Sequence, residues 1–256
     1  MEIRSIIFDV DDTLYDYTSA AKTAMDAISE YCLNNFGWDS AYTKKRTLET
    51  MYRQFNTLGM NDSAIHNRLI RFQMLLEEEK KPVYPHALTM YTLYWDTLCK
   101  NMSIADGVTD FIKAAKSKGI SIGICTDMTS LIQYIKLDKL GILSLLDHIV
   151  TSEEAGVEKP DAGIFDLCIK KSGCLPHECL MIGDNWDKDI LGALDSGMNA
   201  CWFHPENAGK DTLRINFSDP AEPFESKLKT PYIRRYFEEG RLIVTDNYFK
   251  LRDILK

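Results

Sequence analysis

The amino-acid sequence predicts an α/β protein in which a parallel-sheet core carries an inserted helical bundle. A short apolar run, Ile6 to Phe8, reads as a buried strand. Residues 18–101 then show helical spacing only, and strands and helices alternate from Asp106 onward. Such alternation favours parallel pairing with right-handed crossovers. The first strand therefore joins the later sheet, and we assign residues 1–17 and 102–256 to the core and residues 18–101 to the insertion.

The first strand ends in three carboxylates within four positions, which are Asp9, Asp11 and Asp12. Crowded carboxylates repel one another and raise each other's pKa, so they need a cation or a shared proton. Their hard oxygen atoms suit Mg²⁺. The alternative is a solvated acidic turn after an ordinary strand.

The insertion is expected to hold four antiparallel helices, because apolar residues recur at helical spacing in four runs. Gly37 and Gly59 are expected to end the first two helices, and Asp62 or Ser63 to cap the third. The apolar positions of the runs are Ala20, Ala24, Ala27, Ile28 and Tyr31; Leu48, Met51, Tyr52 and Phe55; Ile65, Leu69, Phe72 and Leu76; and Ala87, Met90, Tyr91, Tyr94 and Leu98.

The second half of the chain predicts the rest of the core. Strands are expected at residues 120–125, 148–150, 180–183, 199–203 and 242–245. Helices are expected at residues 111–118, 131–140, 160–171, 188–196 and 248–255, with Pro160 in the first turn of its helix. Residues 205–240 are polar and proline-containing, and we expect an irregular excursion there that covers the domain edge or mediates self-association.

Composition narrows the function classes. The 256 residues are 45% hydrophobic and 27% charged, which is ordinary for a globular protein. The net charge of -8 disfavours a nucleic-acid polymer as partner. No apolar run approaches the roughly 20 residues of a membrane helix, and the chain runs straight from Met1 into a strand, so we expect no signal peptide and a cytoplasmic location. The seven cysteines fit no metal pattern. Monomer and homodimer both stay open.

Polar side chains follow four of the predicted strands at the point where each strand ends or soon after. Ligands of an open parallel sheet bind outside these carboxyl ends. Carboxylates there would hold Mg²⁺, while a hydroxyl and an ammonium would contact phosphate oxygens. The residues are, in chain order, Asp9 and Asp11, Thr126 and Asp127, Lys159, and Asp184 and Asp189.

These four segments, in this order and at these separations, resemble the four motifs of the haloacid dehalogenase (HAD) superfamily. The insertion resembles the C1-type helical cap of its subfamily I, on a Rossmann-like core, and the pattern is closest to the phosphatase and pyrimidine 5′-nucleotidase-like branch. The motifs are Asp9-Val10-Asp11-Asp12-Thr13, Thr126, Lys159-Pro160, and Gly183-Asp184-Asn185 with Asp189.

The resemblance implies a role for each motif residue. Asp9 would be the nucleophile that forms an aspartyl-phosphate, and Asp11 the general acid and base whose backbone carbonyl also binds Mg²⁺. Thr126 would contact phosphoryl oxygens, and Lys159 would offset the charge of Asp9 and phosphate. Asp9 and Asp184 would ligate Mg²⁺.

Two further acidic residues complete the expected site. Asp189 would act through the metal's waters or orient Lys159. Asp127 is a candidate for substrate binding beside Thr126, with helix capping as the alternative. Asp12 is expected to fix the turn into the cap.

The expected function is an Mg²⁺-dependent phosphatase acting on a small phosphorylated metabolite. A 2-haloacid dehalogenase, a phosphomutase and a non-catalytic binding protein on the same fold are the alternatives. Asp11 and Asp184 argue against the dehalogenase, and Asp12-Thr13 departs from the usual phosphomutase pattern. In the cap, Arg46, Arg53, Arg68 and Arg71 are candidates to contact a distal substrate group, with surface salt bridges favoured for each.

Overall fold

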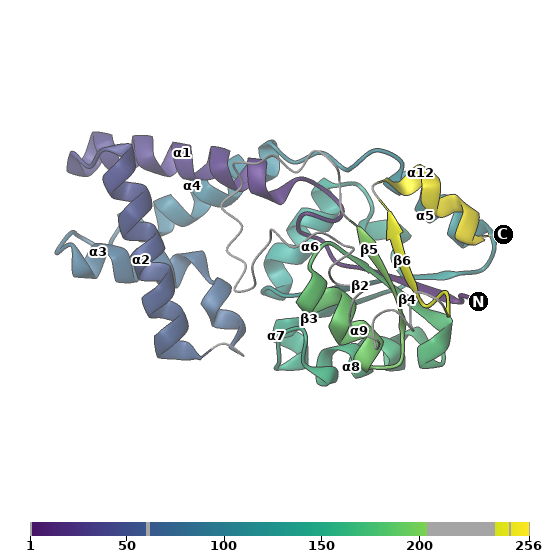
Figure 1. The fold of residues 1–256 in the computed structure, drawn as a ribbon. Helices are drawn as coiled ribbons and strands as arrows, with labels where there is room; N and C mark the ends of the chain where they lie inside the picture. Colours follow the sequence, from purple (N-terminus) through teal and green to yellow (C-terminus); the bar gives the residue numbers. More distant parts are fainter. Residues whose placement is uncertain (1, 60–61, 204–238, 246, 256) are drawn as a thin grey trace.

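The computed structural model describes residues 2–59, 62–203, 239–245 and 247–255 (Figure 1). The excursion expected at residues 205–240 lies, apart from its last two residues, outside this part of the chain. Within the described residues, no helix combines the length and the apolar character that crossing a membrane requires.

The core is built on one six-stranded sheet in the order β3-β2-β1-β4-β5-β6. Every neighbouring pair is parallel, as the alternation of strands and helices predicts. Strands β1, β4 and β5 are buried along their whole length, as is usual in parallel sheets. Their bounds are β1 Ser5–Phe8, β2 Ser121–Thr126, β3 His148–Thr151, β4 Cys179–Gly183, β5 Asn199–Phe203 and β6 Leu242–Thr245.

Helices cover both faces of the sheet. On one face, helices α5 (Val108–Ser117), α6 (Ser130–Lys139) and α12 (Tyr248–Leu251) pack with Ile6 and Phe8 of β1. On the other face, α8 (Ala162–Ser172) and α9 (Gly192–Asp195) pack with Ile7. Because successive strand residues point to opposite faces, three consecutive residues of β1 contribute to two separate hydrophobic clusters.

The insertion forms a helical cap beside the sheet (Figure 1). Its elements are α1 Tyr17–Phe36, α2 Ser40–Leu58, the short 3-10 helix η1 Ser63–His66, α3 Arg68–Glu78 and α4 His86–Lys100. Apolar residues of α1, α3 and α4 join the hydrophobic cluster that includes Ile6 and Phe8 of the core. The cap is therefore packed continuously with one face of the core.

Several element boundaries differ from the sequence prediction. Asp62 caps η1, and Asn67 caps α3 by accepting the N–H groups of Leu69 and Ile70. Pro160 lies before α8, because Asp161 is the N-cap of that helix.

Other elements are split or added relative to the prediction. A short helix α7 (Ser152–Ala155) follows β3 and was not expected. The helix expected at 188–196 is a π-helical turn η4 (Trp186–Leu191) followed by α9. The closing helix divides into α12 and a 3-10 turn η5 (Arg252–Leu255). The remaining 3-10 turns are η2 Leu143–Leu145 and η3 Pro176–Glu178.

Candidate active site

The candidate site lies at the carboxyl end of the central strand. Asp9 directly follows β1, whose neighbours are β2 and β4. Its backbone N–H donates to the carbonyl of Ile182 at 2.9 Å, which extends the strand pairing by one residue. The Asp9 side chain is therefore held at a fixed point among the three central strands, where it is 7% exposed.

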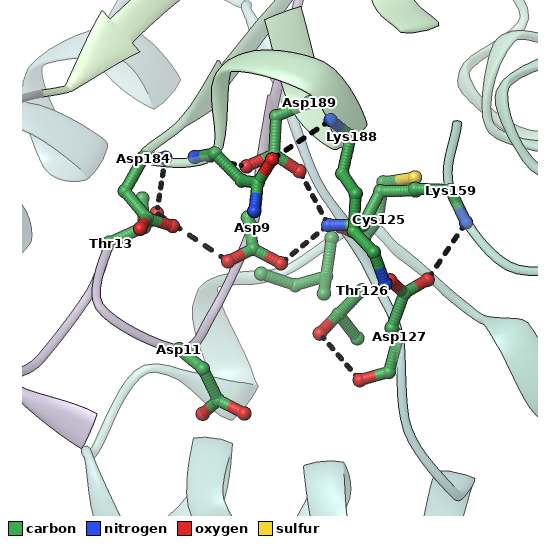
Figure 2. Close-up of polar contacts among 12 residues, drawn as sticks. Asp9, Asp11, Thr13, Cys125, Thr126, Asp127, Lys159, Asp184, Lys188 and Asp189 are labelled. Carbon is green, nitrogen blue, oxygen red and sulfur yellow. Dashed lines mark hydrogen bonds and ion pairs between the residues drawn. The ribbon is translucent and has the colours of Figure 1, made fainter. Parts of the chain in front are cut away.

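A buried lysine joins two carboxylates at this point (Figure 2). The ammonium group of Lys159 lies 2.7 Å from Oδ1 of Asp9 and 2.6 Å from Oδ1 of Asp189. It also donates to the carbonyl of Cys125 at 3.2 Å. Burial alone would lower the pKa of Lys159, but Asp189 and Asp9 raise it well above its ordinary value. Lys159 is thus a fixed positive charge beside Asp9.

Three carboxylates surround one small region. Oxygen atoms of Asp9, Asp184 and Asp189 all lie within 4.8 Å of one another. Burial raises the pKa of Asp184 well above its ordinary value, and the charges of Asp189 and Asp9 raise it further. The Thr13 hydroxyl lies between two of these carboxylates, 3.4 Å from Oδ1 of Asp184 and 3.5 Å from Oδ2 of Asp9.

This donor set fits a divalent cation. Lys159 offsets only part of the negative charge of the three carboxylates, and an uncompensated buried charge is costly. A hard dication bound by oxygen ligands would remove the remaining repulsion. Burial raises the pKa of both Asp9 and Asp184, the neighbouring carboxylates raise it further, and a bound cation would oppose both effects.

Asp189 is positioned by its own loop. Its Oδ2 accepts the N–H of Asn185 at 3.0 Å, while Oδ1 faces Lys159. A Cβ atom at Gly183 would lie 2.3 Å from Oδ2 of Asp189, so only glycine leaves room for this carboxylate. Asp189 therefore lies where it could orient Lys159, and the two roles expected for it stay predictions.

The pKa of Asp9 gives a stability prediction for the metal-free protein. Burial raises the pKa of the Asp9 carboxyl from 3.8 to about 7, with Asp189 and Asp11 adding to the rise and Lys159 opposing it. Between these two values the native state holds a proton that the unfolded state has lost. Native stability should therefore fall as pH rises from about 4 to about 7.

Asp9→Asn removes this titration, because the amide resembles the protonated carboxyl at every pH. The unfolding free energy of wild type relative to Asp9→Asn should fall by up to about 4 kcal/mol across that pH window. Urea unfolding in EDTA at several pH values measures the difference. A difference that does not change with pH would contradict the raised pKa.

Asp11 points away from the carboxylate cluster (Figure 2). The ammonium group of Lys136 lies 2.8 Å from both carboxylate oxygens of Asp11, and the Tyr15 hydroxyl donates to Oδ1 at 2.7 Å. The structure therefore separates the side chains of Asp9 and Asp11, although the residues are two apart. The expected acid–base and metal roles of Asp11 stay predictions.

Lys136 was not among the site residues predicted from the sequence. It is 0% exposed and lies on α6, where its ammonium group is 5.2 Å from the ring centre of Tyr17 and 5.4 Å from that of Trp95. A signal was present, because Lys136 follows Ile132 by four residues and so shares the buried face of α6. A lysine on an apolar helix face needs a partner, and Asp11 is that partner.

Thr126 and Asp127 lie next to the cluster but are engaged by other groups. The Thr126 hydroxyl accepts a hydrogen bond from the side-chain amide of Gln133 at 2.8 Å. Asp127 accepts the backbone N–H of Lys159 at 2.9 Å and the ammonium of Lys188 at 2.7 Å. Burial alone would raise the pKa of Asp127, but Lys159 and Lys188 lower it. Asp127 thus braces the Lys159 loop, and its contact with substrate stays a prediction.

Asp12 has the structural role expected for it. Its φ of 59° lies in the left-handed region, and its carboxylate accepts hydrogen bonds from the backbone N–H and hydroxyl of Thr18 at 3.0 and 2.8 Å. Thr18 lies in the first turn of α1. Asp12 therefore fixes the turn that leads into the cap.

A parallel-sheet core with a helical cap, and an Asp–Lys–Asp cluster at the strand ends, define the class as HAD-like hydrolases. The chain belongs to this family, because the family model for haloacid dehalogenase-like hydrolases matches residues 3–197. The protein is therefore an enzyme of the hydrolase class, as the four motifs predict.

The relatives include named phosphatases. A glyceraldehyde 3-phosphate phosphatase of Methanothermobacter thermautotrophicus is 30% identical over 219 residues, covering 85% of this chain and 93% of the relative. The pyrimidine 5′-nucleotidase YjjG of Escherichia coli is 26% identical over 203 residues, covering 78% and 85%. Among solved structures, a HAD phosphatase from Thermococcus onnurineus has a TM-score of 0.67 at 17% identity, covering 99% and 98%. This structural likeness supports the Rossmann-like core and the cap.

Proposed function

We propose that this enzyme is an Mg²⁺-dependent phosphatase that hydrolyses a small phosphate monoester through an aspartyl-phosphate. The observation that carries the proposal is the buried Asp9–Lys159–Asp189 cluster with Asp184 beside it. The relatives named as phosphatases add support, since their substrates are small phosphate esters.

In the proposed reaction, a carboxylate oxygen of Asp9 attacks phosphorus while the alcohol departs, and water then releases phosphate from the aspartyl-phosphate. Dividing the transfer into two displacements lowers each barrier. Lys159 offsets the charge that gathers when an anionic phosphate approaches Asp9. Thr126 would contact a phosphoryl oxygen, with Asp127 bracing the loop.

Asp11 would donate a proton to the leaving alcohol and later accept one from the attacking water. This role requires the Asp11 side chain to turn from Lys136 and Tyr15 toward Asp9, since its carboxylate is bound by those two groups. Lys136 is therefore proposed as a positioning residue that sets where Asp11 rests.

Asp9, Asp184 and the backbone carbonyl of Asp11 would hold Mg²⁺, and Asp189 would support it through Lys159 or bound water. When bound, the ion would supply positive charge to the transferring phosphoryl group. The dehalogenase and phosphomutase alternatives share the fold; the crowded carboxylates favour the metal-dependent phosphatase over the dehalogenase. Release of halide from a 2-haloacid would instead support the dehalogenase function.

Removal of Mg²⁺ provides the test of the metal. Hydrolysis of p-nitrophenyl phosphate should stop in EDTA and return when Mg²⁺ is added in excess. Mg²⁺ at a hundredfold excess over its dissociation constant should also raise the unfolding free energy by about 2.7 kcal/mol. Asp184→Asn should lose most of this stabilisation, because it removes one of the crowded carboxylates.

Thermal unfolding with and without Mg²⁺ measures the binding independently of activity. Asp138→Asn, which changes an exposed carboxylate on α6, is the matched control and should respond like wild type. Full activity in EDTA would refute the metal role.

A further inference from the structure

The four arginines considered in the cap divide into two pairs with different surroundings. Arg46 is ion-paired with Glu49, Glu78 and Glu79, and Arg53 with Glu78. These two arginines follow the expectation of surface salt bridges. For Arg68 and Arg71 the expectation is wrong.

Arg68 and Arg71 contact neutral groups. Arg68 donates to the carbonyl of His66 at 3.0 Å and to the hydroxyl of Tyr17 at 2.9 Å. Arg71 is 4% exposed and donates to the side chain of Gln54 at 2.9 Å and the carbonyl of Ile65 at 2.8 Å.

Among the described residues, no carboxylate lies within ion-pair distance of Arg68 or Arg71. The chain has 38 acidic and 30 basic residues, so a shortage of acidic residues does not explain why these two arginines lack an acidic partner within the described part of the chain. A buried or half-buried guanidinium without a counter-charge carries a desolvation cost that a bound anion would offset. Burial and the neighbouring charge of Arg68 lower the pKa of Arg71. An anion at this place would favour the charged form of Arg71.

The guanidinium of Arg68 packs against the aromatic rings of Tyr94 and Trp95. The guanidinium carbon of Arg68 lies 5.5 Å from the ring centre of Tyr94 and 5.7 Å from that of Trp95. Trp95 is 6% exposed, and its indole Nε1 is a buried donor with no hydrogen-bond partner in the part of the chain that the structure describes. Buried donors are rarely left unpaired in native proteins. A cationic donor and a neutral donor therefore lie together, and no described residue offers them an anionic acceptor.

This end of the cap is connected to the reaction centre. Trp95 lies 5.7 Å from the Arg68 guanidinium and 5.4 Å from the Lys136 ammonium, which binds Asp11. On the other side, His66 Nε2 lies 2.7 Å from Oε1 of Glu158, the residue before Lys159. Arg68 is thus linked through Trp95 to Lys136 and Asp11, and through His66 to the loop that carries Lys159.

We propose that Arg68, supported by Arg71 and the Trp95 indole, binds a second anionic group of the substrate, a carboxylate or a second phosphate. The proposal rests on the phosphatase function and narrows its substrate class. The proposal requires a molecule that has its phosphate ester at Asp9 and reaches Arg68 with its other charged end. Arg is suited to this task because its planar fork matches carboxylate and phosphate oxygens. Substrates with a neutral distal end would leave the charge uncompensated.

Matched substrate pairs test the proposal on the full chain with Mg²⁺. One pair is 3-phosphoglycerate and glyceraldehyde 3-phosphate, which differ in a carboxylate. The other is fructose 1,6-bisphosphate and fructose 6-phosphate, which differ in a phosphate. Wild type should favour the more anionic member of at least one pair in kcat/KM by about ten- to a hundredfold, the range of a charged hydrogen bond.

Variants at Arg68 assign that preference to its guanidinium. Arg68→Met should reduce the ratio within the preferred pair to about one, mainly through KM. Arg68→Lys, which keeps the charge but not the fork, should keep an intermediate ratio and guards against a folding defect. Arg46→Met is the matched control, because it removes a cap arginine that is already ion-paired, and it should keep the wild-type ratio.

The outcomes separate the two proposals. Hydrolysis of p-nitrophenyl phosphate with no preference in either pair would overturn the second-anion site and leave the phosphatase function standing. A folded Arg68→Met variant that keeps the wild-type ratio of kcat/KM values would also overturn the second-anion site. No hydrolysis of any phosphate ester by wild type would overturn both.

Discussion

Asp9→Asn should lower phosphatase turnover by roughly 10⁴-fold or more, the scale on which loss of a nucleophile is felt. An amide oxygen carries no full negative charge, so it cannot form the covalent bond to phosphorus at a useful rate. The fold should survive, because asparagine has nearly the same shape and Lys159 keeps Asp189 as a partner at 2.6 Å. Steady-state kinetics with p-nitrophenyl phosphate give the first result, and circular dichroism the second.

Asp138→Asn is the control for this substitution. It makes the same chemical change at an exposed position of α6 and should retain wild-type turnover. If Asp9→Asn retained normal turnover, the nucleophile would have to be another residue.

Lys159→Met should damage both activity and stability. The substitution leaves Asp9 and Asp189 buried without their shared cation, and breaking a buried ion pair from one side costs about 3–5 kcal/mol. It also removes the positive charge that we propose faces the phosphoryl group, for which a loss of roughly 10²- to 10³-fold in kcat is expected. Urea unfolding and steady-state kinetics measure the two effects.

Lys44→Met is the matched control, because Lys44 pairs with Asp26 at 2.6 Å but both side chains are exposed to solvent. Exposed pairs contribute at most about 1 kcal/mol, so this variant should stay near wild type. Equal unfolding free energies of Lys159→Met and Lys44→Met would mean that the buried ion pairs of Lys159 stabilise the fold no more than an exposed pair does.

The positions of Asp9, Lys159, Asp184 and Asp189 were predictable from the sequence. Each follows a buried parallel strand or the loop after one, and parallel strands place their carboxyl ends at one edge of a sheet. The order of the strands then brings residues that are far apart in the chain into contact. The alternation of strands and helices was enough to predict a parallel sheet, and the helical spacing of apolar residues was enough to predict a helical insertion.

The direction of Asp11 was not predictable in the same way. In an extended strand, two residues that are two positions apart would point to the same face of the sheet. The chain leaves the strand after β1 and turns at Asp12, whose φ is 59°, so Asp11 points away from Asp9. Its contact with Lys136 depends on how α6 packs beneath the turn into the cap, which local spacing does not specify.

The cap arginines show the same limit. Arg46, Arg53, Arg68 and Arg71 look alike in the sequence, and only the packing of α2, α3 and α4 separates paired from unpaired charges. Helix boundaries shifted for local reasons, as at Asn67, whose side chain caps α3 in place of Asp62 or Ser63.

Chemical trapping of the covalent intermediate is the most direct test of the nucleophile. Enzyme mixed with p-nitrophenyl phosphate and Mg²⁺ is quenched in acid within the first turnover, reduced with borohydride and digested for peptide mass analysis. Reduction converts an acyl phosphate on aspartate to homoserine. The aspartyl-phosphate mechanism predicts homoserine at position 9 in wild type and none in Asp9→Asn. A phosphoryl group trapped on any other residue would contradict it.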